Sequence, residues 1–258
     1  MLKIESKQNS WVMETRKLRE KKYRDQLNLY WIEGIHLLKE VLKSDEKIVT
    51  VAITTQGLLN PEIKEILKQC NDLDVRIFEV SEPVGKQLFE TDTPQGIGAT
   101  IQKEKREVLP DSSGTFLILD HVQDPGNIGT LLRSAEAAGA IGVALTAGCA
   151  DPWSGKVLRA SMGSAFRMPL FTDFNIAKLK VMKNDGWKVY GTATEGSNDY
   201  RGIDFSKKRI LILGSEGRGI SDELIGLIDE SVKISMCQPV ESLNVAVAGS
   251  ILLFEMRQ

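Results

Sequence analysis

This chain of 258 residues has few cysteines, few histidines and a small net charge, and each of these features argues against a class of protein. The three cysteines are odd in number and far apart, which argues against a disulfide framework and indicates a reducing compartment. The two histidines and these cysteines make no zinc ligand set of usual spacing, so we expect no metal. The net charge of −2 provides no overall basic field for a nucleic-acid partner.

Long hydrophobic runs are also missing. No uninterrupted apolar stretch reaches membrane-spanning length, and the N-terminus is polar without the apolar core of a signal peptide. We therefore expect a cytoplasmic protein with no membrane contact. The composition, with 42% hydrophobic and 26% charged residues, is that of an ordinary globular chain. Its length allows one large domain or two small ones.

The spacing of apolar residues predicts two α/β domains. Residues 1–102 alternate between helix and strand, residues 103–114 are charged and then rich in Pro, Ser and Gly, and residues 115–258 restart the pattern. In the first domain we expect helices at Ser10–Asp25, Glu33–Leu42, from Pro61 and at Val84–Glu90, with strands at Ile48–Thr55, Val75–Val80 and Gly96–Gln102. In the second we expect strands at Thr115–Leu119, Ile141–Thr146, Lys188–Ala193, Arg209–Leu213 and Val232–Ser235. Helices between such apolar strands are typical of a parallel sheet covered on both faces.

A turn follows the first strand of the second domain. Asp124-Pro125-Gly126-Asn127 cannot continue a strand, and Asn127 is predicted to cap the helix that follows. Arg133 falls outside the apolar stripe of that helix, so it is free to face a cleft near the helix start. The alternative is a solvated ion pair with Glu136.

Two further turns follow strands. Gly214-Ser215-Glu216-Gly217-Arg218-Gly219 lets backbone approach a ligand closely, yet it fits neither the dinucleotide nor the Walker pattern. The alternative is an ordinary turn with a helix cap at Ser221. Before a helix predicted at Val245–Glu255, Ser242 and Asn244 are both candidate caps. The small residues at the start of this helix suit either close approach of a ligand or subunit, or tight core packing.

Together these three segments resemble the motifs of the SpoU (TrmH) RNA methyltransferases of the SPOUT superfamily. The matching residues are Asp124–Gly129 with Arg133, then Gly214, Glu216, Gly217 and Gly219, then Ser242–Ala248, in the same order and spacing. Glu33-Gly34 and Thr93-Pro94-Gln95-Gly96 are similar to the L30e-like substrate-binding domain that many members carry.

The resemblance implies a catalytic domain with a deep C-terminal trefoil knot, which is a rare exception to normal threading. It also implies a homodimer, and transfer of a methyl group from S-adenosylmethionine to a ribose 2′-hydroxyl of rRNA or tRNA. The implied catalytic or substrate-facing residues are Arg133, Asn127, Glu216, Ser242 and Asn244. The implied cofactor neighbours are Gly214, Ile234, Leu243, Leu213, Thr192, Ala193 and Met236.

A basic segment near the N-terminus gives the implied RNA-binding domain its candidate phosphate contacts. Its six basic residues surround the single acid Glu20, and they are Arg16, Lys17, Arg19, Lys21, Lys22 and Arg24. The alternative is a solvated helix face.

Three other functions stay open at this point. The chain could bind RNA without catalysis, or it could methylate a base rather than a ribose. A dehydrogenase-like enzyme is disfavoured because the glycine fingerprint is missing.

Overall fold

The computed structural model describes residues 1–104, 108–110, 112–192, 198–239 and 242–257. The chain forms two compact units. The first comprises Met1–Glu104 together with Trp153–Arg167, and the second comprises Lys105–Pro152 and Met168–Gln258. The stretch Trp153–Arg167 therefore packs with the first unit, although it lies in the sequence that we assigned to the second domain.

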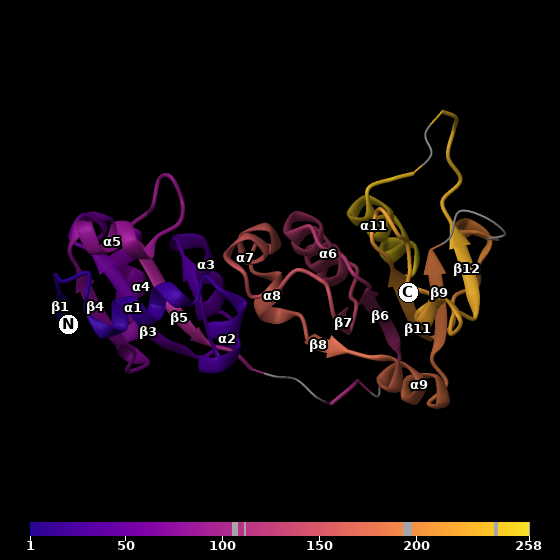
Figure 1. The fold of residues 1–258 in the computed structure, drawn as a ribbon, viewed down its shortest axis with the longest axis horizontal. Helices are drawn as coiled ribbons and strands as arrows, with labels where there is room; N and C mark the ends of the chain where they lie inside the picture. The colour runs from indigo at the N-terminus through magenta and orange to yellow at the C-terminus, as the bar shows by residue number, and fades with distance from the viewer. Residues whose placement is uncertain (105–107, 111, 193–197, 240–241, 258) are drawn as a thin grey trace. The chain divides into compact units, whose positions relative to one another are not determined.

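The first unit is built on a mixed five-stranded sheet in the order β1-β4-β3-β5-β2 (Figure 1). β1, β4 and β3 run parallel, and β5 pairs antiparallel with both β3 and β2. The strands are β1 (Leu2–Ile4), β2 (Leu29–Glu33), β3 (Ile48–Thr54), β4 (Arg76–Val80) and β5 (Ile97–Gln102). The helices are α1 (Ser10–Lys17), α2 (Lys21–Leu27), α3 (Ile35–Leu42), η1 (Gly57–Leu59), α4 (Pro61–Asp72), α5 (Glu82–Leu88), α7 (Gly155–Ser161) and α8 (Ser164–Arg167).

Two predictions for this unit are wrong in detail. The single helix predicted at Ser10–Asp25 is two helices, because Leu18 ends α1 as its C-cap and α2 begins only at Lys21. The helix predicted from Glu33 begins at Ile35, because Glu33 is the last residue of β2. Gly34 makes the turn between them with a φ of 96°, which a residue with a side chain rarely adopts.

The second unit contains a seven-stranded sheet in the order β10-β12-β9-β11-β6-β7-β8, and every paired neighbour is parallel. Its strands are β6 (Gly114–Leu119), β7 (Gly142–Thr146), β8 (Leu170–Phe174), β9 (Lys188–Thr192), β10 (Asn198–Asp199), β11 (Lys208–Leu213) and β12 (Glu230–Lys233). Its helices are α6 (Pro125–Ala137), α9 (Ile176–Asn184), η2 (Tyr200–Gly202), α10 (Asp222–Ile225) and α11 (Val245–Glu255). The predicted parallel sheet is confirmed.

The two faces of this sheet are covered differently. On one face, Phe116 packs its ring against Phe171, Phe174 and Trp187, with ring centroids 5.5 to 6.3 Å apart. On the other, α6 and α11 pack together (Figure 1). The chain leaves β6 toward β7 and β8 but later inserts β11 on the opposite side of β6. In open α/β sheets such a reversal of strand order marks the place where ligands bind, at the carboxyl ends of the strands.

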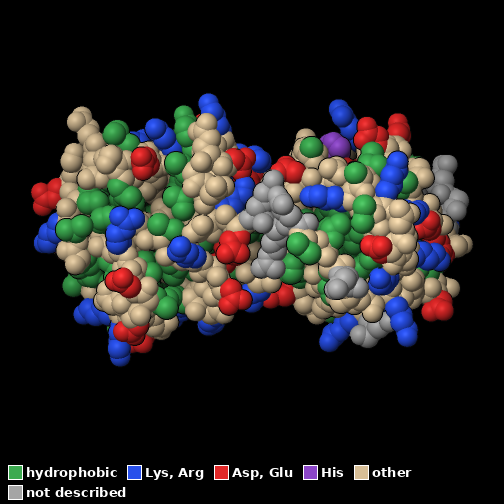
Figure 2. Space-filling model, turned by 90° about the horizontal axis from the view of Figure 1, so that it is seen from below, with side chains coloured by type: hydrophobic (Ala, Val, Ile, Leu, Met, Phe, Trp, Pro, Cys, Tyr) green, Lys and Arg blue, Asp and Glu red, His purple; other side chains and the backbone are tan. Residues whose placement is uncertain are grey.

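One face of the molecule shows no dominance of one charge (Figure 2). On the face drawn in Figure 2, Lys and Arg side chains are interspersed with Asp and Glu, consistent with the net charge of −2. Among the described residues, no helix is both long and apolar enough to span a membrane.

Candidate active site

The three predicted turns meet in one hydrogen-bonded cluster. Asn127 Nδ2 donates to Glu216 Oε1 at 3.0 Å, and Asn244 Nδ2 donates to the same oxygen at 2.7 Å. Asn244 Nδ2 also lies 3.0 Å from Asn127 Oδ1. These residues are far apart in the sequence, and each follows a different strand of the second unit. The cluster joins one carboxylate to two amides beside β6 and β11.

The helix α6 begins differently from the prediction. Asp124, rather than Asn127, is the N-cap, and its Oδ1 accepts the backbone N–H of Asn127 at 2.8 Å. Pro125 occupies the first turn, where its missing N–H costs nothing. Because Asp124 satisfies the helix end, the Asn127 side chain is released from capping and can reach Glu216.

The glycine loop closes on itself. Ser215 and Gly219 exchange backbone hydrogen bonds of 3.1 and 2.9 Å, so the chain returns directly over Gly214. A Cβ atom on Gly214 would lie 2.1 Å from the Gly219 carbonyl carbon. The loop therefore requires glycine at 214 for its own closure, and closure places Glu216 near its tip, exposed.

Both the oxygen and the nitrogen of the Asn244 side-chain amide form hydrogen bonds. Its Oδ1 accepts the backbone N–H of Ala246 at 2.9 Å and that of Val247 at 3.3 Å, so Asn244 is the N-cap of α11. With the oxygen used by the helix, the amide nitrogen faces the Glu216 carboxylate. Of the two candidate caps, the structure uses Asn244, while Ser242 lies two residues earlier and is exposed.

A cavity of about 570 Å³ lies beside the cluster, a size typical of cofactor sites. Its walls include the sequence-predicted cofactor neighbours that the structure describes, together with Glu216 and Ser242; these neighbours are Thr192, Leu213, Gly214, Ile234, Met236 and Leu243. Ala193 lies outside the described residues. The lining mixes aliphatic side chains with backbone and hydroxyl groups, as a nucleoside requires.

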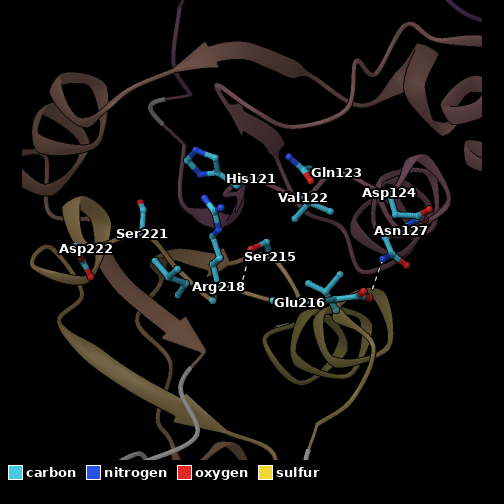
Figure 3. A pocket seen from close by; sticks show the side chains of 14 residues that line it. His121, Val122, Gln123, Asp124, Asn127, Ser215, Glu216, Arg218, Ser221 and Asp222 are labelled. Atoms are coloured by element: carbon cyan, nitrogen blue, oxygen red, sulfur yellow. Dashed lines mark hydrogen bonds between the residues drawn. The ribbon is translucent and has the colours of Figure 1, made fainter.

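A second cavity, of about 700 Å³, adjoins the first. Ser215, Glu216, Gly219 and Val245 line both cavities, so the glycine loop and the start of α11 form a shared wall. Asn127, His121 and Arg218 line the second cavity only. In Figure 3 the Arg218 side chain extends from the glycine loop toward the His121 ring, and the Asn127–Glu216 bond lies at the opposite end.

Asp120, which was not predicted from the sequence, joins the ends of β6 and β7 to Ser221, the residue that follows the glycine loop and Ile220. It is 1% exposed, and its Oδ2 accepts the backbone N–H of Ser221 at 2.8 Å, while Oδ1 lies 2.8 Å from Thr146 Oγ1 and from His121 Nδ1. Burial alone would raise the pKa of this carboxyl, but these hydrogen bonds outweigh burial and hold the pKa below its ordinary value of 3.8. The sequence feature that could have indicated this residue is an acid placed directly after a strongly apolar strand, β6.

Arg133 does not join the cluster. It is exposed on α6 and lines neither cavity, and its side chain forms no hydrogen bond or ion pair within the described part of the chain.

Among the small residues of α11, Gly249 has a packing role. A Cβ atom on Gly249 would lie 2.4 Å from a Leu213 side-chain atom and 2.5 Å from a Leu131 side-chain atom. The absence of a side chain at Gly249 therefore lets α11 contact β11 and α6.

The basic segment of the first unit divides into exposed and structural residues. Arg24 is 4% exposed, and its guanidinium donates to the carbonyls of Leu18 at 2.7 Å and Arg19 at 2.8 Å. It therefore holds the turn between α1 and α2 and is not available to RNA, contrary to its prediction as a contact. The five other basic residues are exposed. Among them, Lys17 and Lys22 lie 5.5 and 5.8 Å from the ring centre of Tyr23.

The described residues hold no group of three or more His, Cys, Asp or Glu side chains with the arrangement of a metal site.

Comparison with known proteins also gives a substrate-binding domain followed by a methylase domain. Residues 114–254 match the model of the SpoU rRNA Methylase family, and residues 9–99 match an MRM3-like substrate binding domain. The chain is 34% identical to the 23S rRNA (guanosine(2553)-2′-O)-methyltransferase RlmP of Bacillus subtilis (strain 168), and the match covers 100% of both chains.

Solved structures agree with this match. An AdoMet-bound rRNA methyltransferase from Sinorhizobium meliloti superposes with a TM-score of 0.88 at 32% identity, covering 99% of this chain and 97% of that one. An RNA 2′-O ribose methyltransferase superposes with a TM-score of 0.81 at 28% identity, covering 99% of this chain and 98% of that one. The motif residues, the parallel sheet and these matches agree, and the chain belongs to the SpoU rRNA methylase family.

Proposed function

We propose that this protein transfers the methyl group of S-adenosylmethionine to a ribose 2′-hydroxyl of 23S rRNA. The observation that carries the proposal is the adjacency of two cavities that share the glycine loop as a wall, where Glu216 lines both cavities and is held by Asn127 and Asn244. One cavity suits the donor and the other the acceptor nucleotide. The relative that acts on 23S rRNA matches the full length of the chain, which favours this RNA over tRNA.

The cavity of about 570 Å³ fits the cofactor by size and chemistry. Leu213, Ile234 and Leu243 provide apolar surface for a flat base, and Gly214 and Gly219 of the closed glycine loop also line the cavity. When bound there, S-adenosylmethionine supplies a methyl group on a sulfonium that is already activated for transfer. The protein therefore needs chiefly to align the acceptor with it, and such positioning lowers barriers by about 7–11 kcal/mol in favourable systems.

The cluster residues would hold the ribose. Glu216 reaches the wall common to both cavities, and its Oε1 is fixed by two amide donors. Asn127 and Asn244 thus set the position of the carboxylate, and Ser242 supplies a hydroxyl on the cofactor side. His121 and Arg218, at the other end of the second cavity, would contact the base or phosphate of the same nucleotide. Asp120 acts as a positioning residue that holds His121 and Ser221.

Arg133 would contact a phosphate of the RNA that flanks the acceptor nucleotide. Its exposure outside both cavities supports this role, because an RNA longer than one nucleotide extends beyond them. A guanidinium is a very weak base that presents several N–H donors in one plane, so Arg133 would act as a clamp on phosphate rather than as a base. The exposed basic residues of the first unit, Arg16, Lys17, Arg19, Lys21 and Lys22, would add phosphate contacts.

We also propose a homodimer and a knotted C-terminal segment, as the family resemblance implies. Val247 and Phe254 on α11 are each 49% exposed, which supports burial of this helix against a second subunit.

Calorimetric titration with S-adenosylmethionine, followed by transfer of its labelled methyl group to unmodified 23S rRNA, tests the function. We expect binding of the cofactor and label in the RNA. Binding without transfer would favour a non-catalytic RNA-binding protein. The absence of both binding and transfer would refute the proposal.

A further inference from the structure

A third cavity lies within the first unit, and the proposed function uses none of its residues. It measures about 350 Å³ and opens between the start of α3 and the loop that leads to β5. Leu37 and Phe89 form its apolar side, and both are buried. His36, Thr91, Thr93 and Gln95 supply ring, hydroxyl and amide groups around it.

Both walls of this cavity are fixed by hydrogen bonds. The Glu33 carboxylate is 8% exposed and accepts the backbone N–H groups of Glu90 at 2.7 Å and Thr91 at 2.9 Å, which holds the start of the loop. At the other end, Gln95 Oε1 accepts the backbone N–H of Ile35 at 2.7 Å. The loop is thus held at both ends against the β2–α3 turn, so the cavity is formed before any ligand binds.

The chemistry of the lining suits a nucleobase. A base has two apolar faces that stack on aromatic or aliphatic groups and a polar edge that forms hydrogen bonds, and the cavity combines Phe89 and Leu37 with hydroxyl and amide groups. Two arginines lie close by, each paired with a carboxylate. Arg159 lines the cavity with its guanidinium 3.8 Å from Glu33, and Arg19 of the basic segment pairs at 2.8 Å with Glu90, beside the loop.

We propose that this cavity binds an unpaired nucleobase of the substrate RNA, extruded from the strand that the basic segment holds. The choice of RNA as the partner rests on the proposed function and on the match of residues 9–99 to a substrate binding domain. The cavity would then select RNA that carries an unstacked base. A fully paired duplex cannot supply such a base without the cost of unpairing it.

Fluorescence anisotropy with the full-length protein tests this proposal. The probes are a short fluorescein-labelled single-stranded RNA of mixed sequence and the same RNA annealed to its complement. His36→Ala removes one ring from the cavity, and Thr93→Trp fills it from an exposed loop position. Leu73→Trp is the matched control, because it adds the same ring at a position 63% exposed that does not line the cavity.

We expect the unmodified protein to prefer the single strand, and both cavity variants to lose roughly tenfold in affinity for it, which is the scale of one stacked base. Binding of the duplex and of S-adenosylmethionine should not change, and Leu73→Trp should behave as the unmodified protein does. Unchanged single-strand affinity in both cavity variants, or equal losses for the two probes, would overturn the proposal. Failure of methyl transfer with this binding pattern intact would count against the proposed function alone.

Discussion

The amide nitrogen of Asn244 lies 2.7 Å from Oε1 of Glu216, so the residue that caps α11 also holds the acid of the glycine loop. The geometry assigns each end of the amide one task. The oxygen is used by the helix N–H groups, and the nitrogen is used by the carboxylate. Motif residues that lie 28 positions apart are coupled in this way, and the coupling can be tested by exchanging charges across it.

Asn244→Asp should lower methyl transfer by roughly tenfold or more, because it places a second carboxylate within contact of Glu216. The helix cap should survive, since a carboxylate also accepts backbone N–H groups. Adding Glu216→Gln should recover much of the loss, because the new amide can donate to the new carboxylate. Steady-state transfer rates for both single variants and the double variant form the cycle. Strictly additive losses would show that the two side chains are not coupled.

Gly214→Ala should abolish binding of S-adenosylmethionine, because its Cβ would lie 2.1 Å from the Gly219 carbonyl carbon and prevent loop closure. Gly217→Ala is the control within the same loop, as a Cβ there meets no atom within 4 Å. Calorimetry should therefore find near-normal cofactor affinity in the second variant only. Equal affinities in the two variants would mean that loop closure does not shape the cofactor cavity.

Arg133→Lys should weaken RNA binding and reduce turnover while leaving cofactor affinity unchanged, because lysine keeps the charge but loses the planar, bidentate contact with phosphate. Lys180→Ala removes one exposed charge from α9 of the same unit, away from both cavities, and serves as the control. RNA affinity and kcat should be measured separately. Full turnover with unaltered RNA affinity in Arg133→Lys would exclude a bidentate clamp.

Asp120→Asn should reduce the free energy of unfolding at about pH 7 by roughly 1–3 kcal/mol, because the amide offers one acceptor oxygen where the carboxylate uses two. The folded-state pKa of Asp120 lies below 3.8, so its stabilisation is present above that pH and is lost as pH falls through the lower value. Urea unfolding across acidic pH should therefore show a weaker acid dependence in the variant. Asp185→Asn, at an exposed carboxylate, should retain the full dependence.

Local patterns were sufficient to predict the catalytic unit in outline. β6, β7, β9, β11 and β12 were expected because near-continuous apolar runs end at turn residues, and α11 has the predicted bounds Val245–Glu255. The convergence of Asn127, Glu216 and Asn244 was expected from the family resemblance. Their mutual hydrogen bonds depend on which atoms each helix end leaves free, and no spacing rule gives that.

What the sequence did not reveal depends on partners distant along the chain. β2 is a strand because it pairs with β5, and Tyr30 within it stacks on Trp153 and Phe166, with ring centroids 4.9 and 6.5 Å apart. Those two aromatic contacts explain why Trp153–Arg167 packs with the first unit. Similarly, Asp124 rather than Asn127 caps α6 because Pro125 begins the helix earlier than its apolar stripe suggests.

The identity of the methylated nucleoside decides whether the protein modifies a ribose. Unmodified 23S rRNA should be incubated with the protein and isotope-labelled S-adenosylmethionine, digested to nucleosides and separated by chromatography with mass detection. We expect label on the ribose of a 2′-O-methylated nucleoside, and loss of this label in Gly214→Ala. Label found only on a base would show that the glycine-loop wall does not bring the donor to a sugar oxygen.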